Sequence, residues 1–115
     1  MNDDGNTPLL FLAANAAVAF ASDPILFIRL AIDLVNGGSD VNHQNRKGRT
    51  AIHELCHQMN WSFSVLFLYM FPFVDVNGMD MAGETPLHIA AYTNQPNLVE
   101  VLLEYGALPD TSGVW

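Results

Sequence analysis

The sequence predicts an all-α fold, a solenoid of three stacked helix-turn-helix units joined by short hairpin turns. Nine-residue segments of similar composition recur three times, as GNTPLLFLA (5–13), GRTAIHELC (48–56) and GETPLHIAA (83–91). A second apolar segment follows each copy and ends in a short polar turn. The connection to the next copy has a constant length, because Asn42 precedes Thr50 by eight positions and Asn77 precedes Thr85 by eight. Self-similar segments at constant spacing are typical of stacked repeats.

The first unit is predicted to span roughly residues 2–44, with helices near 7–20 and 24–36. Pro24 stands at the front of the second helix, where a proline loses no hydrogen bond. Gly37-Gly38 follows that helix, where a left-handed cap favours glycine. These signals place one helix pair in the first unit.

The second unit is predicted to span roughly residues 45–79, with helices near 51–60 and 61–71. Pro72 must end the second of these helices. Phe73 stands where the other two units have glycine, and a phenylalanine resists a positive φ. The geometry of this turn is therefore left open.

The third unit is predicted to span roughly residues 80–112, with helices near 86–94 and 96–105. Thr85 can cap the first helix, and Gly106 follows the second.

Residues 85–90 of the third unit read Thr-Pro-Leu-His-Ile-Ala, which matches the T-P-L-H-x-A signature of the ankyrin repeat. The chain therefore resembles the ankyrin repeat family over nearly its whole length, in three copies. The resemblance implies a protein-binding module that does no chemistry and needs no cofactor. It also implies contact through the hairpin tips and the exposed residues of the first helices, which are Gln44, Arg46, Lys47, Arg49, Met79, Met81 and Glu84 at the tips and His57, Gln58, Tyr92 and Thr93 on the helices.

An enzymatic alternative comes from His53-Glu54-Leu55-Cys56-His57, which fits the H-E-x-x-H pattern of zinc-dependent hydrolases. In those enzymes the two histidines bind zinc and the glutamate activates its water. However, His53 aligns with His88 of the repeat signature, and a third zinc ligand is missing from the extended pattern. We therefore expect neither a metal site nor catalysis here.

A modification site is a further hypothesis. Residues 34–42, LVNGGSDVN, resemble the sequence that asparaginyl hydroxylases accept in ankyrin repeats, with Asn42 as the target. The alternative is that Asn42 only shapes the turn, as asparagine commonly does.

Composition limits the partners. Twelve acidic residues against four basic ones give a net charge of −8, which argues against nucleic acid and against anionic membrane surfaces. Three of the basic residues, Arg46, Lys47 and Arg49, lie on one turn and would suit an acidic patch on another protein. The single cysteine, Cys56, agrees with a reducing intracellular setting, cytoplasmic or nuclear.

The two ends of the stack are expected to be uncovered. Residues 8–21 are apolar, and no polar repeat precedes them in the sequence. The last predicted helix is expected to expose its apolar residues on one side, namely Leu98, Val99, Leu102 and Leu103. We therefore expect self-association through the ends, or membership of a longer repeat stack.

Overall fold

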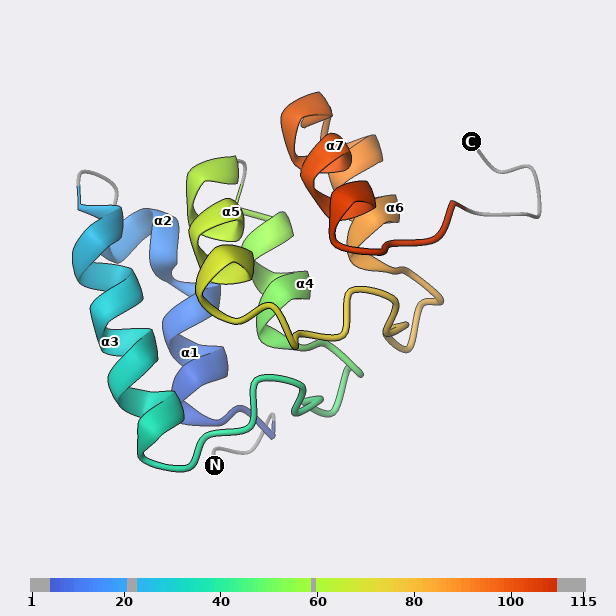
Figure 1. The fold of residues 1–115 in the computed structure, drawn as a ribbon. Coiled ribbons are helices and arrows are strands. Elements are labelled where there is room, and N and C mark those ends of the chain that lie inside the picture. The colour runs from blue at the N-terminus through green and yellow to red at the C-terminus, as the bar shows by residue number, and fades with distance from the viewer. Residues whose placement is uncertain (1–4, 21–22, 59, 110–115) are drawn as a thin grey trace.

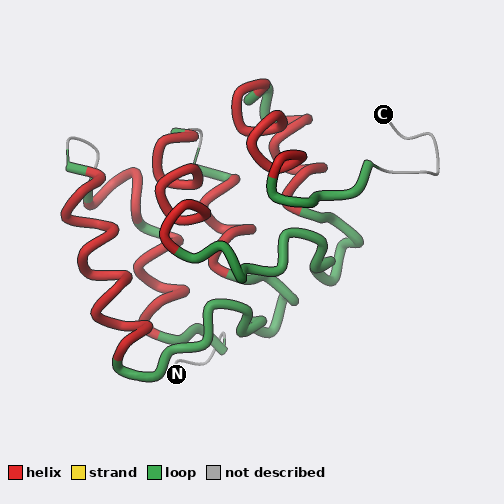
Figure 2. The backbone as a smooth tube through the Cα atoms, viewed as in Figure 1, coloured by secondary structure: helices red, strands yellow, loops and turns green. Residues whose placement is uncertain are grey.

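A computed structural model of the chain describes residues 5–20, 23–58 and 60–109. Within those residues it contains helices and turns but no strand (Figures 1 and 2). The helices are α1 (Pro8–Ala14), α2 (Ala16–Ala19), α3 (Pro24–Asn36), α4 (Ala51–Cys56), α5 (Trp61–Met70), α6 (Pro86–Tyr92) and α7 (Pro96–Glu104). The predicted all-α repeat stack is confirmed.

The helices form two rows, with α1, α4 and α6 in one and α3, α5 and α7 in the other (Figure 1). Along the first row α1 packs on α4 and α4 on α6, while along the second α3 packs on α5 and α5 on α7. The turns that connect successive pairs run along one edge of the stack (Figure 2). Each helix pair therefore contacts only its neighbours, as in other solenoids.

Threonine and proline start α1 and α6 for the reasons that the sequence suggests. The Thr7 Oγ1 accepts a hydrogen bond from the amide of Leu10 at 3.3 Å, and the Thr85 Oγ1 accepts one from the amide of His88 at 3.3 Å. The proline that follows each threonine occupies the first helical turn, where its missing N–H leaves no bond unmade.

Glycine ends α3 and α7 as predicted. Gly38 and Gly106 have positive φ angles of 107° and 97°. The residue after each glycine donates a backbone hydrogen bond to the preceding helix. The Ser39 amide donates to the Leu34 carbonyl at 3.0 Å, and the Ala107 amide donates to the Leu102 carbonyl at 2.9 Å. This is the left-handed cap that favours glycine.

The predicted single helix over residues 7–20 is wrong, because the chain breaks at Asn15 between α1 and α2. The Asn15 Nδ2 donates to the Phe11 carbonyl at 2.8 Å. A side chain from the second copy fills the break: the Gln58 Oε1 accepts from the Ala17 amide at 2.9 Å, and its Nε2 donates to the Ala14 carbonyl at 2.9 Å. The break is thus held by a contact between units.

Two other predicted helices are shorter than expected, since α4 ends at Cys56 and α6 at Tyr92. Met59, within the predicted range 51–60, lies outside the described residues, as do residues 2–4 and 110–112 of the predicted repeats.

The turn after α5 has no positive φ at Phe73, where the other two copies have glycine, nor at Phe71. Phe71 has φ −127° and ψ 70°, and its carbonyl accepts from the Val74 amide at 3.1 Å. Its ring is buried, with its centroid 4.9 Å from that of Phe67 and 6.1 Å from that of Phe73. Aromatic packing therefore replaces the glycine cap in the second copy.

One apolar core runs through all three copies. Phe27 and Phe63 are fully buried and meet edge to face across the first two copies, with centroids 5.3 Å apart. Each such side chain stabilises the fold by about 1.5–3 kcal/mol relative to an exposed position.

The expected exposed patch on the last helix is only partly present. Leu98 and Leu102 are fully buried, because α7 packs them into the core beside α5. Val99 is half-buried, and Leu103 is 43% exposed. The expectation was wrong for Leu98 and Leu102, because it placed all four apolar side chains on one exposed face of the helix.

Candidate partner-binding surface

Two hairpin tips, residues 44–49 and 79–84, are built in the same way. Asn45 and Asp80 each donate a backbone hydrogen bond across the turn, to the carbonyls of Arg49 at 2.9 Å and Glu84 at 3.0 Å. Their side-chain oxygens each accept two further backbone amides at 2.9–3.0 Å. The tips also bond to each other, since the Met81 amide donates to the Lys47 carbonyl at 2.9 Å. The two tips are therefore one continuous edge.

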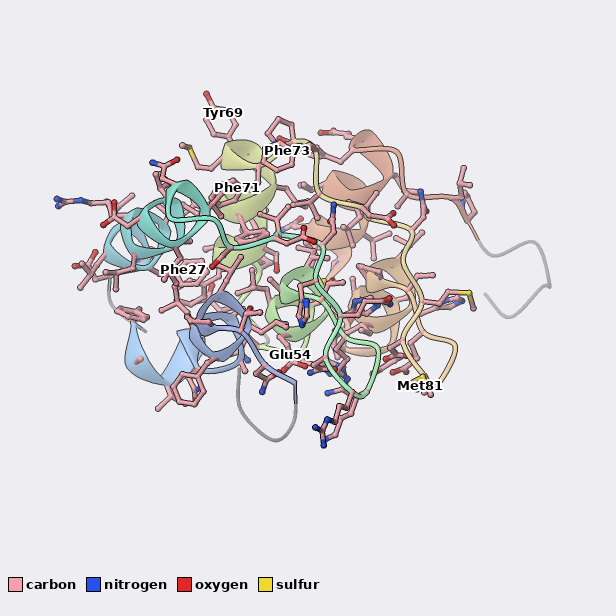
Figure 3. The ribbon with its side chains drawn as sticks, turned by 90° about the horizontal axis from the view of Figure 1, so that it is seen from below. Phe27, Glu54, Tyr69, Phe71, Phe73 and Met81 are labelled. Carbon is pink, nitrogen blue, oxygen red and sulfur yellow. The ribbon has the colours of Figure 1, made fainter. Side chains whose placement is uncertain are left out.

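Exposed basic side chains lie on the first tip of this edge and exposed apolar side chains on the second. Arg46 and Lys47 are exposed on the first tip, and Met79 and Met81 are 56% and 80% exposed on the second. A groove of about 410 Å³ runs between the tips and is lined by Arg46, Lys47, Arg49, Asp80, Met81 and Ala82. In Figure 3, Met81 lies at this edge, while Tyr69 and Phe73 lie at the opposite edge.

Arg49 differs from the other two basic residues of its turn. Its guanidinium lies 3.6 Å from a carboxylate oxygen of Glu54 and 3.7 Å from one of Asp80, and the Asp80 side chain is only 2% exposed. Arg46 and Lys47 have no such ion pair within the described residues. Two cations of the predicted basic turn are therefore open to a partner, and the third is neutralised within the fold.

His57 and Tyr92 form a shallow surface beside the tips. Their ring centroids are 6.2 Å apart, and Tyr92 is 57% exposed. Burial, followed by the nearby charge of Arg49, holds the pKa of His57 below its ordinary value, while the neighbouring carboxylates oppose that shift. Burial and then a hydrogen bond with Glu84 raise the pKa of Tyr92. Both rings are therefore uncharged at neutral pH.

Three of the predicted contact residues also have internal roles. The amide of Gln58 holds the break between α1 and α2, and the Gln44 Nε2 donates to the carbonyls of Gly48 at 2.9 Å and Met79 at 3.2 Å. The Thr93 Oγ1 donates to the Ile89 carbonyl at 2.6 Å. Whether these side chains also contact a partner stays a prediction.

Gln95 joins the second and third copies and was not predicted from the sequence. It is 5% exposed, and its Nε2 donates to the Cys56 carbonyl at 2.7 Å and to the Thr93 Oγ1 at 2.7 Å. It does for α4 what Gln58 does for α1, although the two glutamines are not at equivalent positions of the repeat. No sequence signal identifies it.

The residues of the HELCH segment have separate structural roles. His53 is fully buried, with its Nδ1 2.9 Å from the Thr50 Oγ1 and its Nε2 3.0 Å from the Glu84 carbonyl. Glu54 pairs with Arg49, and Cys56 is buried in the core. Both ring nitrogens of His53 therefore bind protein groups. Among residues 5–20, 23–58 and 60–109, no three His, Cys, Asp or Glu side chains are grouped to hold a metal ion.

Asn42 joins the first and second copies. Its Oδ1 accepts from the Asp75 amide at 2.8 Å, and the Asn77 Oδ1 accepts likewise from the Leu108 amide at 2.9 Å. This accounts for asparagine at both positions, and hydroxylation of Asn42 stays a hypothesis.

Within the described part of the chain, no helix is both long and apolar enough to cross a membrane.

Comparison with known proteins adds independent evidence. A family model described as ankyrin repeats, in three copies, matches residues 21–112. The chain is 31% identical to chicken (Gallus gallus) inversin over 120 aligned residues, which cover 93% of the chain and 10% of inversin. It is 38% identical over 74 residues to an ankyrin repeat protein of Acanthamoeba polyphaga mimivirus, covering 64% of the chain and 18% of that protein. It is also 32% identical over 77 residues to delta-latroinsectotoxin-Lt1a of the spider Latrodectus tredecimguttatus, covering 67% of the chain and 6% of the toxin.

The chain thus spans less than a fifth of the length of each of these relatives. Three stacked helix pairs, the threonine–histidine contacts at the starts of the second and third pairs and the family match agree with one another. The chain belongs to the ankyrin repeat family.

Proposed function

We propose that this chain is a non-catalytic recognition domain whose hairpin tips bind an acidic segment of a partner protein. Ankyrin repeats are in general protein-interaction modules. The observation that carries the finer proposal is the pair of exposed cations at Arg46 and Lys47, neither of which forms an ion pair with another described residue. The chain as a whole has a net charge of −8, so these two cations form a local positive patch on an acidic protein. Such a patch suits a carboxylate-rich partner.

The groove between the tips favours a segment that also carries apolar side chains. Met79 and Met81 offer flexible, polarisable surface beside the two cations. Arg46 can bind a carboxylate through two parallel hydrogen bonds, whereas Lys47 acts as a point charge. His57 and Tyr92 extend this surface with uncharged rings that would contact the partner further along.

A binding assay with fluorescent peptides rich in Asp and Glu, made with and without leucines, tests the proposal. We expect Arg46→Glu to weaken binding at least about fivefold, because one exposed ion pair contributes up to about 1 kcal/mol and the reversal adds repulsion. Arg29→Glu is the matched control, since Arg29 is exposed on α3 and changes net charge equally. Binding should also weaken as salt rises. If both variants lost the same peptide affinity, the effect would come from net charge alone and the proposal would be overturned.

The competing zinc hydrolase makes a different prediction. It requires His53 and His57 to bind zinc, whereas we propose that His53 serves to join the second helix pair to the third turn. Elemental analysis of purified, tag-free protein separates the two. One zinc per chain, lost in His57→Ala, would favour the hydrolase.

We also propose self-association through the ends of the stack. Phe11 is 60% exposed on α1 and Ile25 is 57% exposed on α3, both in the first copy. Apolar surface of this kind commonly marks an interface. Light scattering over a concentration series tests it, and a mass that stays at one chain throughout would refute it.

A further inference from the structure

The first-row helices expose different sides in the first and third copies. Counted from the capping threonines Thr7 and Thr85, Phe11 and Ile89 occupy the same position. Phe11 is 60% exposed, whereas Ile89 is fully buried in the core of the stack, where α6 packs on α4. The corresponding Glu54 of the second copy is partly buried, so this position is covered to some extent where a helix pair precedes it and is open in the first copy.

The second-row helices repeat this pattern. Counted from the prolines that begin α3 and α7, Leu26 corresponds to Leu98 and Leu30 to Leu102. Leu26 and Leu30 are 41% and 37% exposed, whereas Leu98 and Leu102 are fully buried. We call the surface formed by Phe11, Leu26 and Leu30 the leading face.

The third copy leaves the opposite surface open. Ala13 and Ala31 are fully buried, while the corresponding Ala91 is exposed and Leu103 is 43% exposed. In the middle copy Leu68, at the position of Leu103, is fully buried. We call the surface formed by Ala91 and Leu103 the trailing face.

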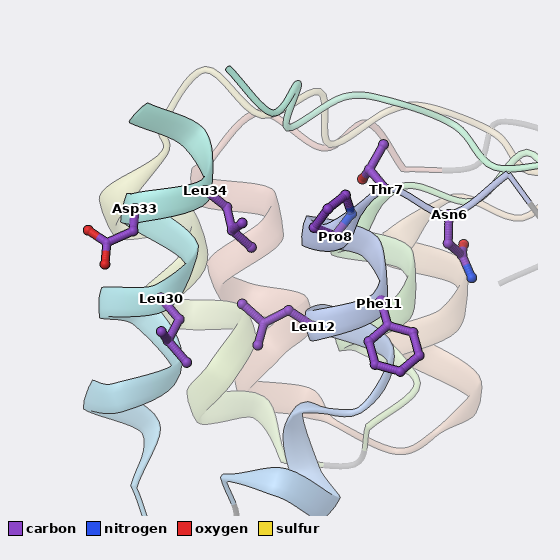
Figure 4. A pocket seen from close by; sticks show the side chains of 8 residues that line it. All are labelled: Asn6, Thr7, Pro8, Phe11, Leu12, Leu30, Asp33 and Leu34. Carbon is purple, nitrogen blue, oxygen red and sulfur yellow. The ribbon is translucent and has the colours of Figure 1, made fainter. Parts of the chain in front are cut away.

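The leading face is hollowed, so it can receive side chains. A groove of about 660 Å³ lies between α1 and α3 (Figure 4). Phe11 and Leu12 of α1 stand on one side of it, and Leu30 and Leu34 of α3 on the other.

We infer that the leading face of one copy of this chain binds the trailing face of a second copy, head to tail. The inference rests on the proposed self-association and specifies its geometry. The two faces are the two halves of a contact that the molecule already makes twice, when α4 and α5 pack on α1 and α3 and when α6 and α7 pack on α4 and α5. Inside the stack each leading face packs on a trailing face, so the open leading face of one chain can pack in the same way on the open trailing face of another. Such an interface is heterologous and does not close on itself at two copies.

Like charges on the two faces oppose this contact, so the association should depend on salt concentration. Asp33 lines the groove of the leading face, and exposed Glu100 lies on α7 beside the trailing face. Each copy also has a net charge of −8. Added salt screens like charges, so the association should tighten as salt rises, which is opposite to the proposed binding of acidic peptides.

Two variants test the geometry when they are examined alone and then mixed. Phe11→Glu/Leu26→Glu places charge on the leading face, and Ala91→Glu/Leu103→Glu places it on the trailing face. All four positions are exposed, and the fold of each variant is checked by circular dichroism. Tyr69→Glu/Phe73→Glu is the control, since it adds the same charge at side chains that are 72% and 62% exposed at the opposite edge from the tips.

Sedimentation should give a wild-type mass that rises with concentration beyond two copies. Each face variant alone should associate at least about tenfold more weakly, because a buried unpaired carboxylate is costly, while the control associates like the wild type. An equimolar mixture of the two face variants should form a one-to-one dimer, since one intact leading face then meets one intact trailing face.

The contrary outcomes are distinct. A trailing-face variant that still dimerises alone, with no new species in the mixture, would overturn head-to-tail packing and leave self-association standing. A wild type that stays at one chain throughout would overturn both. Neither result bears on the peptide assay at Arg46.

Discussion

His53 lies within α4 and His57, four positions later, caps its C-terminal end, yet their surroundings differ in kind. His53 is fully buried and uses both ring nitrogens, one within its own copy and one toward the carbonyl of Glu84 in the next. His57 is half-buried, with its Nε2 shielded from solvent and without a hydrogen-bond partner within the described residues. The first histidine thus stabilises the contact between copies. The second favours its neutral form, so its protonation should lower the stability of the fold.

Replacing His57 with glutamine should remove a pH dependence of stability. Burial lowers the pKa of His57 from its ordinary 6.5, so the unfolded chain binds this proton more readily than the folded one. The contribution is fully present above pH 6.5 and is lost as pH falls below it toward the lowered value. Urea unfolding of both proteins across this range measures it as a difference, in which the other titrating groups cancel. A difference that does not change with pH would contradict the shift.

Cys56 should resist thiol reagents in the folded protein. It is fully buried, and burial raises the pKa of its thiol to about 12, so almost no thiolate is present at neutral pH. A chromogenic disulfide reagent should react only as fast as the protein unfolds. The same reagent in denaturant is the control, and rapid labelling under native conditions would mean that α4 opens locally.

At the scale of elements, the sequence predicted what local chemistry decides. The starts of α6 and α7 follow from Thr85 and two prolines, and the ends of α3 and α7 follow from glycine. The break at Asn15 could not be predicted, because it depends on Gln58 reaching back from the next copy. The end of α5 was not predicted for a different reason, since it depends on how the Phe71 ring packs within its own copy, and the sequence does not show that packing.

The candidate surface was predictable to a similar extent. The sequence located the basic turn, but it could not separate the paired Arg49 from the open Arg46 and Lys47. That separation depends on Asp80, which lies one copy further along the chain. Contacts within a copy leave a local pattern in the sequence, and contacts between copies leave much less.

Gly48→Ala should destabilise the stack more than Gly38→Ala. Both glycines have positive φ, which costs a residue with a Cβ about 1–2 kcal/mol. A Cβ at Gly38 would meet nothing within 4 Å, whereas one at Gly48 would lie 2.9 Å from the Met81 amide. That amide bonds to the Lys47 carbonyl, so the substitution adds about 1 kcal/mol for a disturbed hydrogen bond between tips. Equal losses in thermal unfolding would show that the tips are not coupled.

At the scale of the whole molecule, burial is unevenly distributed. The middle helices α4 and α5 pack against a helix pair on both sides, whereas the first and third pairs each have one neighbour. The stability of a solenoid is roughly a sum of the repeats and their contacts, so a pair with two neighbours should open last. The leading and trailing faces are the surfaces of the first and third pairs that pack on no other helix pair of the chain.

Hydrogen exchange should therefore rank the copies, with the amides of α5 slower than those of α3 and α7. The experiment belongs at low concentration, or in Phe11→Glu/Leu26→Glu, so that association does not protect the ends. Gln95→Leu should then speed exchange in α6 and α7, because it leaves the Cys56 carbonyl without its donor at about 1–3 kcal/mol, while exchange in α3 stays unchanged. Gln58→Leu is the mirror variant and should speed exchange in α1 and α2 instead. Uniform exchange in all three copies, unaffected by which glutamine is replaced, would mean that the stack opens only as one unit and that contacts between copies, rather than the copies themselves, carry its stability.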